Sequence, residues 1–381
     1  MERSLYLFQN SLKSEKSYKT YYTNLNLFRR FCTANSFDDL TRISPKKLQE
    51  LLEDYVISLK QRVNPNSVPT YYYPIQSFLE CNEIELKWKK IRRLFPAKVK
   101  KTGKQAWSIE DIRRMLSVTN NLRNKALILL LASSAVRIGA IEELKIRNLL
   151  EMPLNCKAIC VYEDSIEEYC TLITPEASQA LENYLNKRKQ DGEHITDESP
   201  LFRTSYTKVT SPVQRLSVRG ASETILRILR KAGLRNNEEK KNGRYYKMPD
   251  HAFRKRVITI LKSNSKIPTS MAEKIAGHQI YRDETGMIVN LDVSYNVPTP
   301  EKLFNFYKHA IQDLTIDDVA KVKAQELDIQ RKYSALEEEK RKHFEEKKRW
   351  YKTILERAKM EGEIPEWVKP IMEEMIQDFE S

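Results

Sequence analysis

Five polar residues, set in order along the chain, place the strongest constraint on what this sequence can be. Arg137 stands at the end of a long apolar run, and His251 and Arg254 follow three residues apart. His278 comes after a glycine, and Tyr295 comes after a serine. An arginine fork can bind two phosphate oxygens at once, a histidine can donate or accept a hydrogen bond at the same centre, and a tyrosine hydroxyl can attack phosphorus. The set therefore suits the cleavage of a phosphodiester bond.

The contexts of the two arginines favour an anion as their partner. Arg137 leaves the apolar run of residues 126–136, where a guanidinium is costly without an anion. If their segment is helical, His251 and Arg254 share one helix face. A capped start at Pro249-Asp250 would then aim both at an anion near the helix N-terminus. The structural alternatives are an exposed arginine just past a core helix for Arg137 and a core histidine for His278.

Together the ordered residues resemble the tyrosine recombinase (phage integrase) family, and specifically its archaeal virus- and plasmid-type integrases. The spacing of His251 and Arg254 matches the family's His-x-x-Arg motif, and Gly277-His278 is similar to its Leu-Gly-His motif. Archaeal relatives carry a run similar to Leu-Asp-Val-Ser-Tyr295-Asn-Val-Pro-Thr. The resemblance implies that the catalytic residues at the scissile phosphate are Arg137, His251, Arg254 and His278, with Tyr295 as the nucleophile.

Two other tyrosines compete with Tyr295 for the role of nucleophile. Tyr295 lies 17 residues past His278, whereas relatives commonly use about half that spacing, so residues 281–290 resemble an inserted loop. Tyr281 follows His278 so closely that little room is left for a separate nucleophile helix, and Tyr307 comes later. The surrounding motif favours Tyr295.

Two positions depart from the family's pattern. Relatives usually carry a lysine on a β-hairpin, where it protonates the departing 5′ oxygen, but the turn of residues 162–168 holds no lysine. Lys157, on the first strand, is the nearest candidate for this general acid, with a solvated strand lysine as the alternative. Many relatives also carry an acidic residue three positions after the first arginine, where this chain has Ala140. Glu142 and Glu143 are the candidates to replace it.

The helix signals predict a mainly α chain with a small β-hairpin or sheet. In residues 1–97 they comprise an apolar stripe over Ser14 to Cys32, a helix start at Ser44-Pro45 and a helix that includes Tyr71 to Cys81. A basic linker over residues 98–106 leads into a second domain, residues 107–312. By resemblance, the two are a helical core-binding domain, which binds DNA, and the tyrosine recombinase catalytic domain.

Within the second domain the sequence predicts where several elements begin and end. They are a capping box at Ser108 to Asp111, a hairpin of Lys157 to Tyr162 with Glu168 to Ile173, a helix starting at Thr174-Pro175, an extended Pro200 to Arg203, and helices over Val213 to Ala232 and His251 to Ser263. Residues 313–381 form a charged helical tail. Val322, Ile329 and Leu336 lie seven apart in it, which indicates a weak coiled-coil seam, with a single solvated helix as the alternative.

The amino-acid composition mainly indicates the kind of binding partner and the cellular compartment. The net charge is +14 over 381 residues, with 40% hydrophobic and 31% charged residues, and the sequence pI is about 9.3. Such a basic chain favours nucleic acid, although a lysine-rich surface alone would give the same balance. The 5 cysteines are scattered, so buried thiols are expected rather than a disulfide framework or a metal site. No signal region or membrane-length apolar run is evident, and we expect a cytoplasmic, nucleoid-associated protein without a membrane partner.

The resemblance implies a site-specific recombinase, an integrase of a mobile element. It implies double-stranded DNA attachment sites as the partner, a homotetramer assembled on DNA, and a 3′-phosphotyrosyl intermediate that needs neither metal nor other cofactor. A resident Xer-like recombinase that resolves chromosome dimers, a type IB topoisomerase and a non-catalytic DNA-binding relative are the alternatives.

Overall fold

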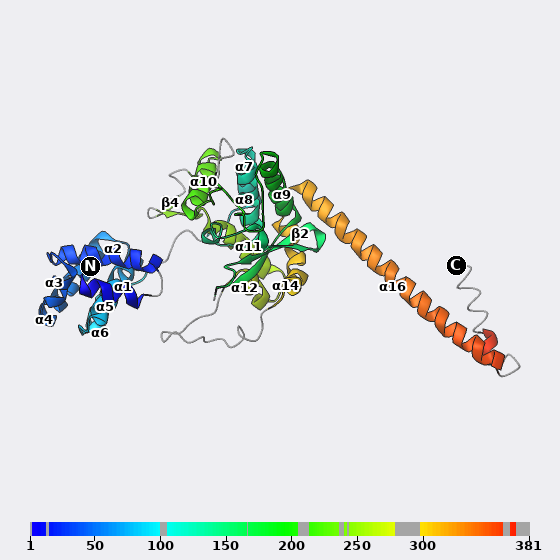
Figure 1. Cartoon of the computed structure of the whole chain (residues 1–381), viewed down its shortest axis with the longest axis horizontal. Coiled ribbons are helices and arrows are strands. Elements are labelled where there is room, and N and C mark those ends of the chain that lie inside the picture. Colours follow the sequence, from blue (N-terminus) through cyan, green and yellow to red (C-terminus); the bar gives the residue numbers. More distant parts are fainter. Residues whose placement is uncertain are drawn as a thin grey trace. The chain divides into compact units, whose positions relative to one another are not determined.

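The computed structural model of the chain describes residues 2–12, 15–99, 105–165, 167–204, 213–235, 240–241, 244–278, 298–360 and 366–370. Figure 1 shows the helices and strands with their labels. The chain divides into two compact units, Met1–Lys101 and Thr102–Ser381. The division falls inside the basic stretch of residues 98–106.

The first unit is built from helices around an aromatic core. They are α1 (Arg3–Ser11), α2 (Glu15–Phe31), α3 (Phe37–Arg42), α4 (Pro45–Arg62), α5 (Val68–Cys81) and α6 (Trp88–Arg93). Phe8, Phe28 and Phe78 are fully buried in this core. Helix α4 starts at Pro45 as predicted, although the side chain of Ser44 makes no capping hydrogen bond. Helix α1 is an element that the sequence analysis did not predict.

The second unit is centred on α8 (Leu122–Ser133), which is buried on nearly every side because its residues 126–132 are all apolar. Around it lie α7 (Ile109–Ser117), α9 (Pro175–Gln190), α10 (Val218–Lys231), α11 (His251–Ser263), α12 (Thr269–Ile275), α14 (Pro300–Tyr307) and α15 (Ile311–Leu314). The predicted capping box is confirmed, since Ser108 and Asp111 exchange hydrogen bonds at the start of α7. Thr174 also caps α9 as predicted, with Pro175 in the first turn.

A small antiparallel sheet crosses this unit in the order β1-β2-β3, with strands β1 (Leu149–Met152), β2 (Cys156–Val161) and β3 (Tyr169–Ile173). The predicted hairpin is therefore confirmed, with Val161 opposite Tyr169, and β1 is an additional strand. A two-stranded pair, β4 (Lys240–Lys241) and β5 (Arg244–Tyr245), precedes α11. Together with the predicted helices, the sheet confirms the mainly α fold class.

One boundary prediction and one capping prediction were wrong, for identifiable reasons. Helix α10 begins at Val218 rather than Val213, because Arg203 and Arg215 form a β-bridge that holds the preceding residues extended. Helix α11 does begin at His251, but the Asp250 side chain does not cap it. The Asp250 carboxylate instead accepts a hydrogen bond from the Ser222 hydroxyl, at 3.0 Å.

The charged tail is one long helix, α16 (Asp318–Met360), as predicted. Its first residue is anchored, because Arg113 pairs with Asp318 at 2.7 Å and also donates to the backbone oxygen of Ile316. Along the helix, Val322, Ile329 and Leu336 are each more than half exposed. Among the described residues, no helix is long and apolar enough to cross a membrane.

Candidate active site

One cavity of the second unit brings together residues that lie more than a hundred positions apart in the sequence. It measures about 390 Å³. The turn after α8, the end of β2 and the start of α11 form it, and its lining residues are Val136, Arg137, Ile138, Gly139, Tyr162, Met248, Pro249, Asp250, His251 and Arg254. Three of the predicted catalytic residues, Arg137, His251 and Arg254, therefore line one cavity.

Arg254 is the most deeply placed of the three. It is 3% exposed, and its Nη1 donates to the backbone oxygen of Ala135, just before the turn that carries Arg137. Its Nη2 is buried and forms no hydrogen bond of good geometry with a described residue, although the phenol of Tyr169 interacts with the guanidinium. Burial and the nearby Arg137 both lower the pKa of Arg254. A buried cationic donor without a well-formed hydrogen bond is costly, and an anion entering the cavity would remove that cost.

Arg137 connects the cavity to the turn that carries His278. Its side chain is exposed, and Nη1 donates to the backbone oxygen of Gly277 at 3.3 Å. Gly277 has φ +59°, and a Cβ there would lie 2.5 Å from ring atoms of Tyr169. Only glycine fits this turn without displacing the Tyr169 ring, because the conformation and the space both exclude a side chain.

The two histidines are held in different ways. Partial burial lowers the pKa of His251, and Lys255, Arg254, Arg137 and His278 lower it further. A neutral imidazole of this kind has one donor and one acceptor nitrogen. The Nδ1 of His278 contacts the carboxylate of Glu273, on α12. That contact leaves the other ring nitrogen, Nε2, available to a ligand.

Glu273 is a positioning residue that the sequence analysis did not identify. Burial raises its pKa, but Lys262 and His278 outweigh burial, so the net shift is downward. The Lys262 ammonium and the His278 ring both contact its carboxylate. A carboxylate that fixes the orientation of an imidazole is a common supporting arrangement in catalytic sites. The sequence signal, a glutamate five residues before His278, is too common to be informative by itself.

The predicted nucleophile lies outside the described residues, and so does its rival Tyr281. The other rival, Tyr307, is fully buried, and its hydroxyl donates to the backbone oxygen of Ser133 at 2.9 Å. Burial raises its pKa well above the ordinary value for tyrosine. Tyr307 thus has the surroundings of a core residue and does not line the cavity.

Lys157, the predicted general acid, is not among the residues that line the cavity. Its ammonium contacts Glu151 and pairs with Glu182 at 3.0 Å, and its side chain is 8% exposed. Burial lowers the pKa of Lys157, but these two carboxylates outweigh burial, and the net shift is upward. Lys157 is the second residue of β2 whereas Tyr162 follows its last residue, so the two lie about 17 Å apart along the strand direction.

Neither glutamate that could replace the missing acidic residue lines the cavity. Ala140 is 1% exposed and packs in the core. Glu142 accepts a hydrogen bond from the backbone nitrogen of Val218 at 3.1 Å and pairs with Arg215 at 3.4 Å. Its carboxylate therefore supports the start of α10.

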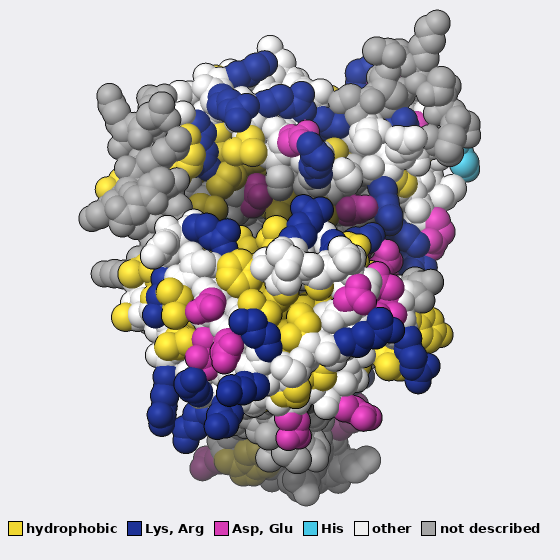
Figure 2. All heavy atoms as spheres, turned by 90° about the vertical axis from the view of Figure 1, so that its left-hand side faces the viewer, with side chains coloured by type: hydrophobic (Ala, Val, Ile, Leu, Met, Phe, Trp, Pro, Cys, Tyr) yellow, Lys and Arg dark blue, Asp and Glu magenta, His cyan; other side chains and the backbone are white. Residues whose placement is uncertain are grey.

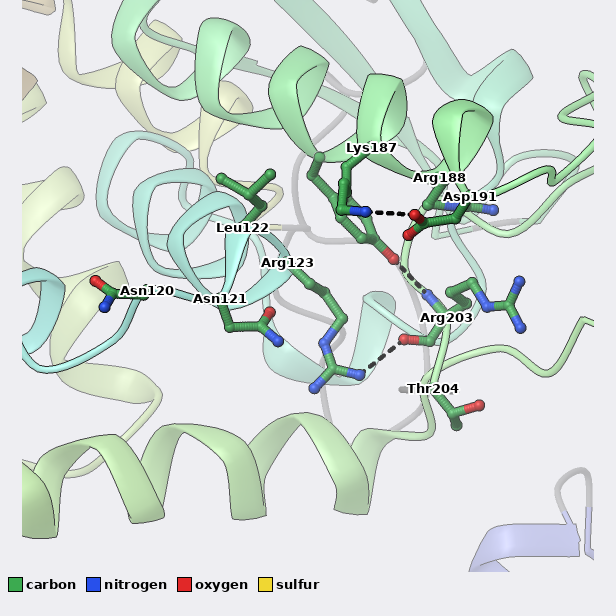
Figure 3. Close-up of a pocket in the computed structure, with 10 residues that line it drawn as sticks. Asn120, Asn121, Leu122, Arg123, Lys187, Arg188, Asp191, Arg203 and Thr204 are labelled. Carbon is green, nitrogen blue, oxygen red and sulfur yellow. Dashed lines mark hydrogen bonds and ion pairs between the residues drawn. The ribbon is translucent and has the colours of Figure 1, made fainter. Parts of the chain in front are cut away.

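A second basic cavity, of about 300 Å³, lies at the other end of α8. Figure 3 shows its lining residues Asn120, Asn121, Leu122, Arg123, Tyr184, Lys187, Arg188, Asp191, Arg203 and Thr204. Beside it, Glu193 receives hydrogen bonds from Arg188 Nε at 3.0 Å and from Arg203 Nη1 at 2.6 Å. Lys187 pairs with Asp191 at its edge. Carboxylates of the chain itself thus neutralise most of the cations around this cavity.

Comparison with known proteins supports the resemblance noted in the sequence. Residues 107–283 match the phage integrase family. No curated protein sequence matches the chain. The fold is similar to that of the Tn1549 transposon integrase in complex with circular intermediate DNA, with 12% identity over 79% of this chain and 97% of that one and a TM-score of 0.50.

Two further solved structures are similar to this chain, with comparable sequence identities and TM-scores. The Tn1549 integrase in complex with transposon right end DNA is 10% identical, over 72% of this chain and 91% of that chain, with a TM-score of 0.50. A lambda integrase dimer bound to a COC′ core site is 13% identical, over 72% of this chain and 89% of that chain, with a TM-score of 0.49. At these identities the Tn1549 likenesses establish the fold. The family match covers the segments that carry Arg137, His251, Arg254 and His278, so residues 107–283 of this chain form a domain of the phage integrase family, the family of the tyrosine recombinases.

Proposed function

We propose that this protein is a site-specific DNA recombinase that cuts and rejoins DNA through a 3′-phosphotyrosyl intermediate. The observation that carries the proposal is the shared cavity of Arg137, His251 and Arg254, in which the buried Nη2 of Arg254 forms no hydrogen bond of good geometry with a described residue. A scissile phosphate is an anion of suitable size and geometry for two guanidinium groups. Negative charge that develops on its equatorial oxygens would be stabilised there.

Each predicted catalytic residue has a role in this proposal. Tyr295 attacks phosphorus, a bond forms between its oxygen and the phosphate, and the bond to the 5′ oxygen breaks. Arg137 and Arg254 hold the non-bridging oxygens, and His251 and His278 hydrogen-bond to the same phosphate. The 5′ hydroxyl of a partner strand reverses the step, so the energy of the phosphodiester bond is kept in the protein–DNA ester.

Double-stranded DNA is the proposed partner. The basic helix α6 carries Lys89, Arg92 and Arg93, which are exposed and form no ion pair among the described residues. Figure 2 shows Lys and Arg side chains spread over the face in view, among hydrophobic and fewer acidic ones. The similar Tn1549 and lambda integrase structures contain DNA. We propose that residues 1–97 and 107–312 act as core-binding and catalytic domains, joined by the basic linker, on the attachment sites of an archaeal mobile element.

A trapping experiment tests the proposed chemistry. DNA with a nick just past the cleavage position loses a short fragment after attack, so a covalent adduct accumulates and migrates slowly on a denaturing gel. We expect the adduct with the unsubstituted chain and none with Tyr295→Phe, which should still bind DNA. An adduct of undiminished yield in Tyr295→Phe would transfer the role to Tyr281 or Tyr307. Binding without any adduct in the unsubstituted chain would identify a non-catalytic DNA-binding relative.

The tail is proposed to serve assembly of a tetramer on two DNA sites. Its exposed Val322, Ile329 and Leu336 would be covered by a neighbouring protomer. A chain that ends at Asp313 is a poor test, because Leu314 and Ile316 are buried in the catalytic unit. A chain that ends at Val319 keeps both residues. Light scattering with site DNA should show a smaller complex for this shortened chain, and complexes of equal mass would exclude the tail from assembly.

A further inference from the structure

The proposed reaction creates a need for a proton that its assigned residues do not meet. When the bond between phosphorus and the 5′ oxygen breaks, that oxygen carries the electron pair away as an alkoxide, which is a poor leaving group unless it is protonated. Lys157 is engaged by Glu151 and Glu182 and does not line the cavity. The inference that follows rests on the proposed function and concerns which cavity residue supplies this proton.

Few residues that line the cavity can donate a proton at neutral pH. Burial raises the pKa of the Asp250 carboxyl, against the opposing effects of Ser222 and Arg235, but its Oδ2 accepts a hydrogen bond from the Ser222 hydroxyl, which favours the carboxylate form. His251 is neutral, for the reasons given above, and its ring is also needed at the phosphate. The remaining hydroxyl among the described lining residues belongs to Tyr162, the residue that follows β2.

The backbone and the neighbours of Tyr162 place its phenol over the arginine turn. Tyr162 has φ +57°, an uncommon conformation for a residue other than glycine and one that often occurs at functional sites. Its ring lies beside that of Tyr169, with centroids 6.3 Å apart and planes at 59°. Its hydroxyl lies 3.8 Å from the position that a Cβ would take at Gly139, two residues after Arg137. The phenol therefore occupies the same wall of the cavity as the Arg137 turn.

The Tyr162 hydroxyl is also available to a ligand. It forms no hydrogen bond with any described residue, and its side chain is only half-buried. Burial raises the pKa of the phenol, and the nearby Arg137 lowers it, with a net upward shift. The group is therefore protonated at neutral pH, as a proton donor must be. Arg137 and Arg254 would stabilise the phenolate that forms when the proton leaves.

We propose that Tyr162 is a catalytic residue that donates its phenolic proton to the departing 5′ oxygen. As the bond from Tyr295 to phosphorus forms, the neutral imidazole of His251 accepts the Tyr295 proton, and as the bond to the 5′ oxygen breaks, a proton moves from the Tyr162 oxygen to the 5′ oxygen. In the joining step the Tyr162 phenolate takes the proton of the attacking 5′ hydroxyl and His251 returns its proton to the Tyr295 oxygen, so protons balance over the cycle.

A leaving-group substitution tests this role directly. The nicked substrate is made in two forms, one with the natural oxygen and one with sulfur at the 5′ bridging position of the scissile phosphate. A thiolate leaves without protonation, so a general acid has no effect on the sulfur substrate. For Tyr162→Phe we expect the rate of adduct formation to fall about 100-fold or more on the oxygen substrate. On the sulfur substrate the variant should react within a few-fold of the unsubstituted chain.

Matched measurements decide between the outcomes. Tyr333→Phe, which removes the same hydroxyl from an exposed position on α16, should react like the unsubstituted chain on both substrates. An equal slowing of Tyr162→Phe on both substrates would show that Tyr162 only positions the DNA, and normal rates on both would show that it is dispensable. Either result overturns the proposal. If the unsubstituted chain binds DNA but cleaves neither substrate, the proposed function itself fails, and the proposal for Tyr162 fails with it.

Discussion

The two ends of α8 carry arginine-lined cavities that differ in where the counter-charge comes from. At the end that begins with Leu122, the buried Glu193 binds both Arg188 and Arg203. Beyond the other end, Arg137 and Arg254 form no ion pair with a carboxylate of the described residues. Arginine content alone therefore does not distinguish a structural cluster from a binding site, whereas the source of the negative charge does.

The energetic consequence of this difference is testable. A buried ion pair is strongly destabilised when one partner is removed, because the other charge is left without compensation. A cavity that lacks its own counter-ion already carries that cost in the free protein and recovers it when an anion binds. We therefore expect substitutions near Glu193 to change stability and substitutions at Arg137 to change reaction rate.

The largest expected effect is a fall in the rate of adduct formation in the Arg137→Lys variant. Lysine keeps the charge but lacks the planar fork that binds two phosphate oxygens, so the rate of adduct formation should fall about 100-fold or more. The midpoint of thermal unfolding should change little, because the Arg137 side chain is exposed. Adduct formation at a near-normal rate in this variant would make Arg137 a structural residue and remove the distinction between the two cavities.

Glu193→Gln should have the opposite profile. It leaves Arg188 and Arg203 buried without their counter-ion, and we expect the free energy of unfolding to fall by about 3 kcal/mol. The matched control is Glu198→Gln, which removes an exposed partner of Lys145 and Arg147 and should lower the free energy of unfolding far less. Urea denaturation measures both. Equal losses in the two variants would contradict a special role for the buried pair.

The contribution of Glu193 should also depend on pH in a defined direction. Burial raises its pKa, but hydrogen bonds from Arg188 and Arg203 outweigh burial and leave it below the ordinary value of 4.5. A depressed pKa gives stability that is fully present above the unfolded value and is lost as the pH falls through the folded value. The difference in unfolding free energy between the unsubstituted chain and Glu193→Gln should therefore be constant near pH 6 and shrink below about pH 4.5. A constant difference down to pH 3 would show that Glu193 acts by packing alone.

Local signals in the sequence predicted the parts of the fold that depend on neighbouring residues. The caps at Ser108 and Thr174 and the β2–β3 hairpin are short-range features, and the structure confirms them. The start of α10 was wrong because a long-range bridge between Arg203 and Arg215 overrides the helix pattern there. Pairing with a distant segment leaves no periodic signal in the segment itself.

The residues of the candidate site also divide into those that a local sequence signal predicts and those that only tertiary structure reveals. Arg137, His251 and Arg254 could be predicted because each stands in a short motif, and the structure brings them to one cavity. Glu273 and Tyr162 could not be predicted, since each acts through a tertiary contact or through its position at the end of a strand. Tyr295 stays a prediction from its motif, as it lies outside the described residues.

The smallest expected effect is on the salt dependence of DNA binding. If Arg137 contacts a phosphate, Arg137→Ala should reduce the slope of log affinity against log salt by about 1, because one fewer counterion is released. Lys187→Ala removes the same charge at the edge of the other cavity, where Asp191 already neutralises it, and should leave the slope unchanged. Titrations of labelled site DNA between about 50 and 200 mM salt cover the range in which such slopes are resolved. An equal reduction of the slope in both variants would mean that DNA binding responds only to the total charge of the protein and that DNA does not bind preferentially at either cavity.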